Sequence, residues 1–348
     1  MASTETRKAD GTSEAQQTRG GFVFAARSGL YISLILTVAF CAGGYSLRKY
    51  GIFGCQASGY GSDRYLVYCG ATSYGDYDHG AIWFGLEPAA ITAATNAHVL
   101  FIGNSRTQFA FSSKATADWF SSLSESYYLL GFSHWENYTF EAPLLHNLRP
   151  KAKVYVINID LFFERSETGP GKTVMRDESA KTRYEEKRKW QRIHERICTT
   201  FSAVCGDDIA IFRSRRTGAW RVTDWRFQSE PVSYDDDVDQ KMVSSYAASA
   251  SQFLPSLSMD RGCTILTIVP TVKTSIGTAK AIASGLGLNF VAPRLDGLVT
   301  FDQVHLNEES AQRWSAAFFE KAGPQIRKCL AEYPESHVAM MDREVVNH

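Results

Sequence analysis

Three side chains far apart in the sequence have the types needed for nucleophilic catalysis. Ser105 follows an apolar run, and Asp302 and His305 stand three residues apart near the C-terminus. A carboxylate beside one imidazole nitrogen leaves the other nitrogen free to deprotonate a serine hydroxyl. Each motif alone has a simpler interpretation, as a capped turn or as an N-cap beside a surface histidine. Together they predict a Ser-His-Asp triad that attacks an acyl carbonyl.

The segment around Ser105 predicts how this serine is presented. Residues 99–102 form an apolar, partly β-branched run typical of a buried parallel strand, and residues 103–105 form a tight turn. A helix is expected from residue 107 to about residue 119. Ligands of open α/β sheets bind at the carboxyl ends of the strands, and the first N–H groups of a helix can hold an oxyanion.

Strands and helices alternate along the rest of the chain, which predicts an α/β protein with a parallel sheet covered on both faces. Further strands are expected at residues 127–132, 153–160, 263–270 and 288–292, and further helices at 87–95, up to 259, at 275–285 and after 307. The aspartates at 235–239 lack the glycine and the terminal glutamate of a calcium loop, so they predict the N-terminus of the helix that ends near 259.

The chain divides into a polar start, an apolar segment and a large domain. The expected organisation is a disordered tail (1–28), a transmembrane signal-anchor helix (29–47), a linker or small lid (48–80), a catalytic domain (81–330) with an insertion (165–230), and a C-terminal tail (331–348). The apolar run is uninterrupted, and its length is close to the ~20 residues that span a bilayer. A cleaved signal peptide and a buried core helix are the alternative interpretations of this run. Basic residues flank both ends and favour only weakly an N-terminus inside the cytoplasm. The insertion contains a charged, solvated helix in which His194 is expected at the surface.

The charge composition and the cysteines indicate which partners, compartment and metal content to expect. The 348 residues carry 37 basic and 37 acidic side chains, so no charge bias predicts a nucleic-acid partner. Cys41 lies in the apolar segment, and six cysteines remain outside it, which suits an oxidising compartment. Pairs Cys55–Cys69 and Cys198–Cys205 are expected to be disulfides, whereas Cys263 is equally compatible with a free buried thiol. Neither close pair has zinc-ligand spacing, so no metal is expected.

The serine motif and the Asp-x-x-His motif together resemble the SGNH (GDSL-like) hydrolase superfamily over roughly residues 97–325. Ser105 lies in Gly-Asn-Ser-Arg, with Asn104 where the family usually has aspartate, and Asp302 with His305 matches the C-terminal motif. The resemblance implies a flavodoxin-like, three-layer α/β/α sandwich and no cofactor. The Gly-x-Ser-x-Gly elbow of α/β-hydrolases is absent because Thr107 stands where its second glycine would be.

The same resemblance implies an oxyanion hole built from three donors. The backbone N–H groups of Ser105 and Gly131 match two of them. The third donor, an asparagine after the third strand, has no clean counterpart: Asp160 falls in its register, and Asn158 offers the amide two residues earlier. An ionised Asp160 would repel the developing oxyanion.

The function implied by the resemblance is an envelope-anchored serine esterase or O-acyltransferase that acts on ester-linked acyl groups, with acetyl favoured, of a cell-surface glycan in the bacterial periplasm. Asn104, Arg106, Trp135 and Asp160 are candidate substrate-binding residues, and Trp220, Trp225 and Tyr138 are aromatic candidates more typical of a core. The alternative is a non-catalytic module that binds glycan or a partner in a polysaccharide-modification complex. A nucleotide enzyme is excluded because the sequence has no Gly-rich phosphate loop.

Overall fold

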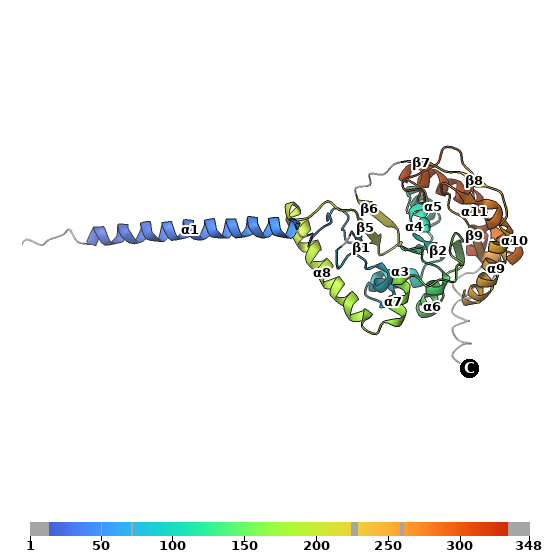
Figure 1. Ribbon diagram of the computed structural model, residues 1–348, viewed down its shortest axis with the longest axis horizontal. Helices are drawn as coiled ribbons and strands as arrows, with labels where there is room; N and C mark the ends of the chain where they lie inside the picture. Colours follow the sequence, from blue (N-terminus) through green and yellow to red (C-terminus); the bar gives the residue numbers. More distant parts are fainter. Residues whose placement is uncertain (1–13, 50, 71, 224–228, 258–260, 333–348) are drawn as a thin grey trace, which may run out of the picture.

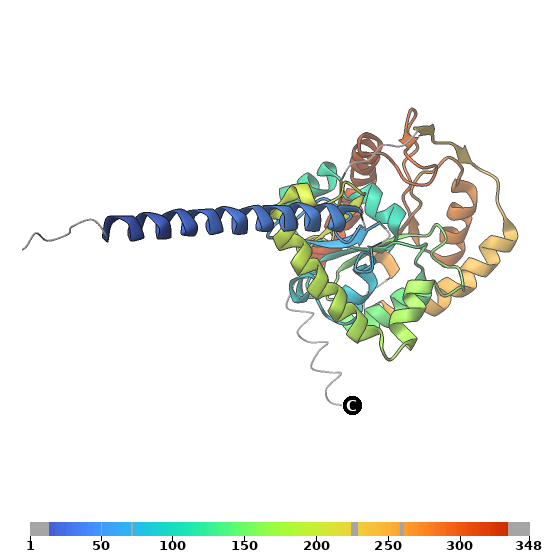
Figure 2. The same cartoon turned by 60° about the vertical axis from the view of Figure 1, so that its left-hand side comes forward.

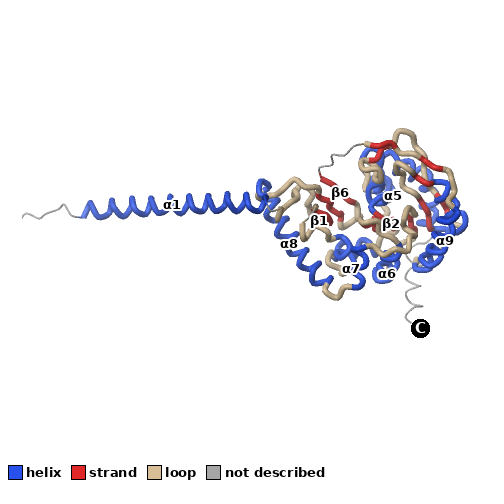
Figure 3. Tube along the Cα trace, in the orientation of Figure 1, coloured by secondary structure: helices blue, strands red, loops and turns tan. Residues whose placement is uncertain are grey.

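The structure is a computed structural model that describes residues 14–49, 51–70, 72–223, 229–257 and 261–332. One long helix, α1 (Glu14–Lys49), projects from a rounded body that contains the other described elements (Figure 1). In the view of Figure 2, turned by 60°, the N-terminal part of α1 still projects from the body, while its C-terminal part overlaps the body. Within the body the strands gather in groups wrapped by helices (Figure 3).

Five parallel strands form the central sheet. Their bounds are β2 (Val99–Asn104), β3 (Tyr127–Phe132), β4 (Val154–Asn158), β9 (Thr264–Thr267) and β11 (Asn289–Phe290). Their spatial order is β11-β9-β4-β2-β3. Every residue of β2, β3 and β4 is buried, which explains why these segments are continuously apolar in the sequence. The predicted parallel sheet is confirmed, and β4, β9 and β11 are shorter than predicted.

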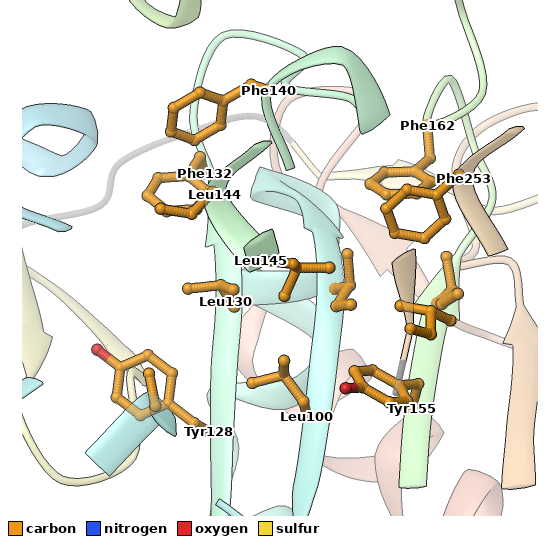
Figure 4. Packing of buried hydrophobic residues seen from close by; sticks show 14 of the residues in the cluster. Leu100, Tyr128, Leu130, Phe132, Phe140, Leu144, Leu145, Tyr155, Phe162 and Phe253 are labelled. Atoms are coloured by element: carbon orange, nitrogen blue, oxygen red, sulfur yellow. The ribbon is translucent and has the colours of Figure 1, made fainter. Parts of the chain in front are cut away.

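Alternate residues of the central strands enter two separate hydrophobic cores. Leu100 and Ile102 of β2 pack into one core, and Val99 and Phe101 pack into the other. The first core, part of which is seen in Figure 4, receives α3 (Pro88–Thr95), α6 (Tyr138–Leu148), α9 (Gln240–Phe253) and α10 (Ile276–Leu286). The second core receives α4 (Ser105–Phe111), α5 (Lys114–Leu123) and α11 (Glu308–Glu332). Helices from both halves of the chain therefore pack against the central sheet through these two cores.

Two helices differ in extent from the sequence prediction. The single helix expected after Ser105 is two helices, because Ser113 caps α5 by accepting a hydrogen bond from the N–H of Thr116. Helix α9 begins after Asp239, whose carboxylate caps it, so the predicted helix start at the aspartate run is confirmed. Its α-helical part ends at Phe253 rather than near 259, and a short 3₁₀ turn, η2 (Leu254–Ser256), follows.

A second, antiparallel sheet joins the region before the central sheet to the insertion. It consists of β1 (Arg64–Cys69), β5 (Ala210–Ser214) and β6 (Trp220–Thr223), in the order β1-β5-β6. Residues 48–80, expected to form a linker or small lid, thus contain β1, which pairs with a strand of the insertion. Helices α2 (Asp78–Trp83), α7 (Gly169–Arg176) and α8 (Ala180–Thr200) contact one another, and η1 (Ser202–Val204) follows α8. The remaining short elements are β7 (Glu230–Pro231), β8 (Tyr234–Asp235), β10 (Thr274–Ser275), β12 (Val299–Thr300) and η3 (Arg261–Cys263).

Helix α8 is less solvated than the sequence predicts. His194 is fully buried, contrary to the expected surface position. Its Nε2 lies 2.9 Å from the carbonyl oxygen of Cys55, and its Nδ1 lies 3.0 Å from the hydroxyl of Tyr60. Burial lowers the pKa of His194 against the opposing effect of the Cys55 carbonyl. This histidine thus joins α8 to the residues that precede β1.

Helix α1 contains the predicted apolar segment. Residues Ser28–Leu47 have a mean hydropathy of 1.8 and none of them is buried against the body, so by length and composition this stretch can cross a membrane. The polar region before it is helical from Glu14, so the predicted disordered tail does not extend to residue 28. The remainder of that tail, residues 1–13, and most of the expected C-terminal tail lie outside the described residues.

Three disulfides hold the body together. The predicted pairs Cys55–Cys69 and Cys198–Cys205 are both present, and Cys263 pairs with Cys329 rather than remaining a free thiol. Cys263 ends η3, just before the central strand β9, and Cys329 lies near the end of α11. Together with α1, these disulfides are consistent with a membrane-anchored or secreted protein.

Removing the Cys263–Cys329 disulfide should destabilise the protein more than removing Cys198–Cys205. The first closes a loop of 66 residues and the second a loop of 7. Loop-closure entropy then gives costs of about 4 and about 2 kcal/mol for the two Cys→Ala double variants. Urea denaturation of the detergent-solubilised chain measures both free energies of unfolding. Equal losses would contradict this ordering.

Candidate active site

Ser105 is the first residue of α4, directly after β2. Asn104 caps the helix through its side-chain oxygen, which accepts a hydrogen bond from the Arg106 N–H at 3.0 Å. The N–H of Ser105 has no partner within the helix, as expected of a first residue. Gly103 has a φ of +149°, and a Cβ atom there would lie 2.3 Å from Oγ1 of Thr107. Glycine is therefore required at this position for the helix to start so close to the strand.

Asp302 and His305 lie in a tight loop between β12 and α11. The loop is closed by an isolated bridge between Thr300 and Leu306, and by a hydrogen bond of 3.0 Å from the Phe301 N–H to the carbonyl of His305. Within the loop, Oδ1 of Asp302 accepts hydrogen bonds from the N–H groups of Val304 (3.2 Å) and His305 (2.8 Å). The three-residue spacing of the motif thus lets the Asp302 carboxylate stabilise, by hydrogen bonds, the loop in which it lies.

The structure brings the three predicted catalytic residues together. Nε2 of His305 lies 2.8 Å from Oγ of Ser105, although 200 residues separate them. Nδ1 of His305 lies 2.7 Å from Oδ2 of Asp302. These distances are those of a serine nucleophile, a base and a carboxylate that orients the base. The side chains of His305 and Asp302 are 15% and 32% exposed, so a substrate can reach them.

The carboxylate of Asp302 is kept ionised by its partners. Partial burial opposes ionisation, but the hydrogen bonds from the His305 ring and from the N–H groups of the loop outweigh it, so the pKa of Asp302 is lowered. An ionised Asp302 accepts the Nδ1 proton of His305 and leaves Nε2 as the basic nitrogen that faces Ser105.

Two aromatic residues that the sequence reasoning missed hold the imidazole in place. The ring of Phe301 stacks on that of His305 at 5.5 Å between centroids, with 16° between the planes. Phe109 of α4 contacts the same imidazole at 4.6 Å and meets Phe301 edge to face. Phe109 lies one helical turn after Ser105, and Phe301 stands beside Asp302 in the sequence. These positions next to the motifs were the only signal that could have found them.

The candidate binding residues Asn104, Arg106, Trp135 and Asp160 form one connected group beside Ser105. Arg106 makes an ion pair with Asp160, and its guanidinium lies 4.9 Å from the centre of the Trp135 ring. The side-chain amide of Asn104 donates to the carbonyl of Asp160 at 3.0 Å. Burial lowers the pKa of Arg106 to about 10, with Asp302 acting in the opposite direction, so its guanidinium remains charged at neutral pH. The negative charge of Asp160 is thus compensated next to the serine.

Asn158 lies at the carboxyl end of β4, next to the end of β2. A Cβ atom on Gly103 would lie 3.3 Å from Cβ of Asn158. The side-chain oxygen of Asn158 accepts a hydrogen bond of 3.2 Å from the Val269 N–H, whereas its amide nitrogen is buried and has no hydrogen-bond partner among the described residues. A buried amide donor without a partner is costly in a folded protein. Here the Asn158 amide is a donor available near Ser105.

Gly131 lies within a strand rather than in a loop that follows it. It lies within β3 in register with Gly103, and its carbonyl accepts hydrogen bonds from Gln108 at 2.9 Å and from Arg213. A Cβ atom on Gly131 would lie 2.7 Å from the carbonyl oxygen of Asn104. Glycine here therefore allows β3 to approach the end of β2. The oxyanion role of Gly131 stays a prediction.

A small cavity lies beside the site. It has a volume of about 70 Å³, and it is lined by residues after β4 and β9 and by α9 and α10, including Asp160, Ile159 and Ile268. The segment after β9 is joined to the loop that carries Asp302 and His305, because the Val272 N–H donates to the carbonyl of Gln303 at 3.1 Å. Asp160 therefore borders both the cavity and the Arg106 pair.

The aromatic candidates for sugar stacking differ in exposure. Trp135 is 47% exposed, whereas Trp220 is buried and Tyr138 packs against the core. Trp225 lies outside the described residues. Among the candidates that the structure describes, Trp135 is therefore the one that a glycan can reach.

One group within the described ranges has the spacing of metal ligands, namely His194, Cys198 and Cys205. The two cysteines form a disulfide, so they provide no thiolate for a metal ion.

No protein-family model, curated protein or solved structure matches the chain.

Proposed function

We propose that the protein is a serine esterase or O-acyltransferase of the SGNH type, anchored in the cell envelope by α1. The observation that carries the proposal is the continuous hydrogen-bonded series from Ser105 through His305 to Asp302. Further support comes from the position of Ser105 at the carboxyl edge of a parallel sheet, where open α/β folds bind ligands. The full three-layer SGNH architecture is part of this proposal.

The proposed reaction passes through an acyl-enzyme. Oγ of Ser105 attacks the ester carbonyl while Nε2 of His305 takes the hydroxyl proton, and the imidazolium that forms is stabilised by Asp302. The oxyanion is held by the N–H of Ser105 and the unpaired amide of Asn158, with the N–H of Gly131 as the third proposed donor. His305 then protonates the leaving alkoxide as the C–O bond breaks. Water or a sugar hydroxyl gives its proton to His305, attacks the acyl carbon and releases Ser105.

The proposed substrate is an ester-linked acyl group, preferably acetyl, on a cell-surface glycan. The exposed ring of Trp135 beside Arg106 supports a sugar acceptor, because flat aromatic faces pack well against sugar rings. Helix α1 and the three disulfides support a single-pass protein whose domain lies outside the cytoplasm, in the periplasm of a bacterium.

A fluorophosphonate probe tests the nucleophile directly. The full chain, solubilised in detergent with its disulfides intact, is treated with the probe and separately with a short-chain acyl ester. We expect labelling and turnover in the wild type and neither in Ser105→Ala. His305→Ala is expected to lose at least most of both, because the hydroxyl is no longer activated. Ser121→Ala and His146→Ala are matched controls, since both side chains are exposed and lie outside the site.

The outcomes separate catalysis from binding. Loss of labelling in the two site variants but not in the controls would support the triad. A folded wild type that neither labels nor turns over the ester would contradict the esterase proposal. Binding of an acetylated glycan by that inert protein would instead favour the non-catalytic module, alone or with a partner of a polysaccharide-modification complex.

A further inference from the structure

Helix α8 carries an apolar stripe that the body does not cover. Trp190, Ile193 and Phe201, the residue just after the helix, are 45%, 41% and 51% exposed. With the half-buried Ile197, they recur at the three- and four-residue spacing that places side chains on one helix face. The adjacent face of the helix is buried through Tyr184, the fully buried His194 and Cys198. The stripe is therefore an outward-facing surface of a well-anchored helix.

The same helix is strongly basic. Its sequence contains seven Lys or Arg residues and three Glu residues. Lys189, Arg192 and Arg196 are exposed next to the apolar stripe, and none of the three has an ion-pair partner among the described residues. An apolar stripe bordered by unpaired cations is the pattern of a helix that lies on an anionic bilayer.

Contacts between α1 and the segment after α8 determine where the apolar stripe lies along the axis of α1, relative to its apolar segment. The ring of Phe201 meets that of Phe40 edge to face at 5.9 Å, and a Cβ atom on Gly44 would lie 3.2 Å from a methyl group of Val204. Phe40 is seven residues before the end of the apolar segment at Leu47, which is about 10 Å along a helix. Figure 1 shows the end of α8 beside the end of α1, with the helix running along the part of the body nearest to α1.

We propose that α8 and the Cys198–Cys205 loop form a membrane-contact surface that holds the body against a bilayer with anionic headgroups. Phe201 enters the interface beside α1, Trp190 and Ile193 contact the acyl-chain boundary, and the neighbouring cations pair with headgroup phosphates. This inference rests on the membrane anchoring proposed above. It gives a tethered enzyme a fixed orientation, so that its active site faces substrates at a constant height above the membrane.

Tryptophan quenching by brominated lipid tests the contact in the full chain. The protein is reconstituted into vesicles of phosphatidylcholine and phosphatidylglycerol in which the phosphatidylcholine is brominated near the headgroup end of its acyl chains. The difference between the wild type and Trp190→Phe isolates the emission of Trp190. We expect this emission to be blue-shifted and strongly quenched. Trp135→Phe is the matched control, because Trp135 is equally exposed but lies at the candidate site, and its emission should change little.

A second comparison tests the electrostatic part. The triple variant Lys189→Gln, Arg192→Gln and Arg196→Gln should lose quenching of Trp190, and vesicles of phosphatidylcholine alone should quench the wild type less. Flotation of the vesicles at alkaline pH reports separately on anchoring by α1. Protein that fails to float would overturn both the anchoring and the surface contact. Protein that floats with Trp190 quenched no more than Trp135 would overturn the surface contact alone.

Discussion

Replacing Asp302 by asparagine is expected to lower kcat for ester hydrolysis by about 10⁴-fold, because the carboxylate orients the imidazole and stabilises its protonated form. In the folded protein Oδ2 of Asp302 accepts from Nδ1 of His305, and its lowered pKa keeps it ionised. An amide removes the charge and can turn its NH₂ group toward His305, which favours the tautomer with the proton on Nε2. That tautomer cannot take the proton of Ser105. Steady-state turnover of a short-chain ester measures the loss.

The control for this variant is Asp296→Asn. Asp296 is exposed and lies in the segment before β12, so it shares the local chain but not the imidazole. Its kcat should match the wild type. Because Oδ1 of Asp302 also accepts two N–H bonds within its loop, thermal unfolding of Asp302→Asn must be compared with the wild type. A stable Asp302→Asn protein with kcat close to the wild type would contradict the assigned role.

The central sheet could be predicted because its strands are buried on both faces. Strand β3 was placed at its observed bounds, since all six of its residues are apolar or glycine and buried. The small antiparallel sheet could not be found in the same way. Strand β1 lies in a Gly- and Tyr-rich region, and its pairing with β5 joins residues about 145 positions apart, as in the Tyr65–Arg213 pair. No local pattern records such a pairing.

The candidate catalytic residues could be selected from the sequence because their chemistry is visible in short motifs, whereas the contacts that support them come from several elements. The spacing of Asp302 and His305 is local, and the loop geometry follows from it. The packing of Phe301 and Phe109 against the imidazole requires α4 and the loop that carries Asp302 and His305 to meet. The unpaired amide of Asn158 is recognisable only once the position of β4 beside β2 is known.

The pairing of Arg106 with Asp160 resolves a difficulty that the sequence raises. Under the SGNH assignment proposed above, Asp160 stands in the register of an oxyanion-hole asparagine, where its charge alone would oppose an oxyanion. The ion pair with Arg106, the residue after the nucleophile, offsets that charge. Asn104, which stands where the proposed SGNH assignment expects an aspartate, adds no further carboxylate and donates to the carbonyl of Asp160.

Arg106→Met should therefore lower the free energy of unfolding by about 3–5 kcal/mol, because it leaves the largely buried carboxylate of Asp160 without its cation. The double variant Arg106→Met with Asp160→Asn should recover most of that loss, since neither charge remains. Urea denaturation of the detergent-solubilised chain measures both. Arg183→Met, which removes the exposed ion pair with Asp177, is the matched control and should change stability little.

The same variants separate a structural role of the pair from an electrostatic role in the reaction. If Arg106 only neutralises Asp160, the double variant should react with the fluorophosphonate probe nearly as fast as the wild type, because the region around Ser105 is then free of the opposing charge. If the guanidinium also stabilises the oxyanion or binds the acyl donor, the double variant will regain stability but not its labelling rate. Arg106→Met with wild-type stability would contradict the pairing itself, since an unpaired carboxylate with so little exposure cannot be free of cost.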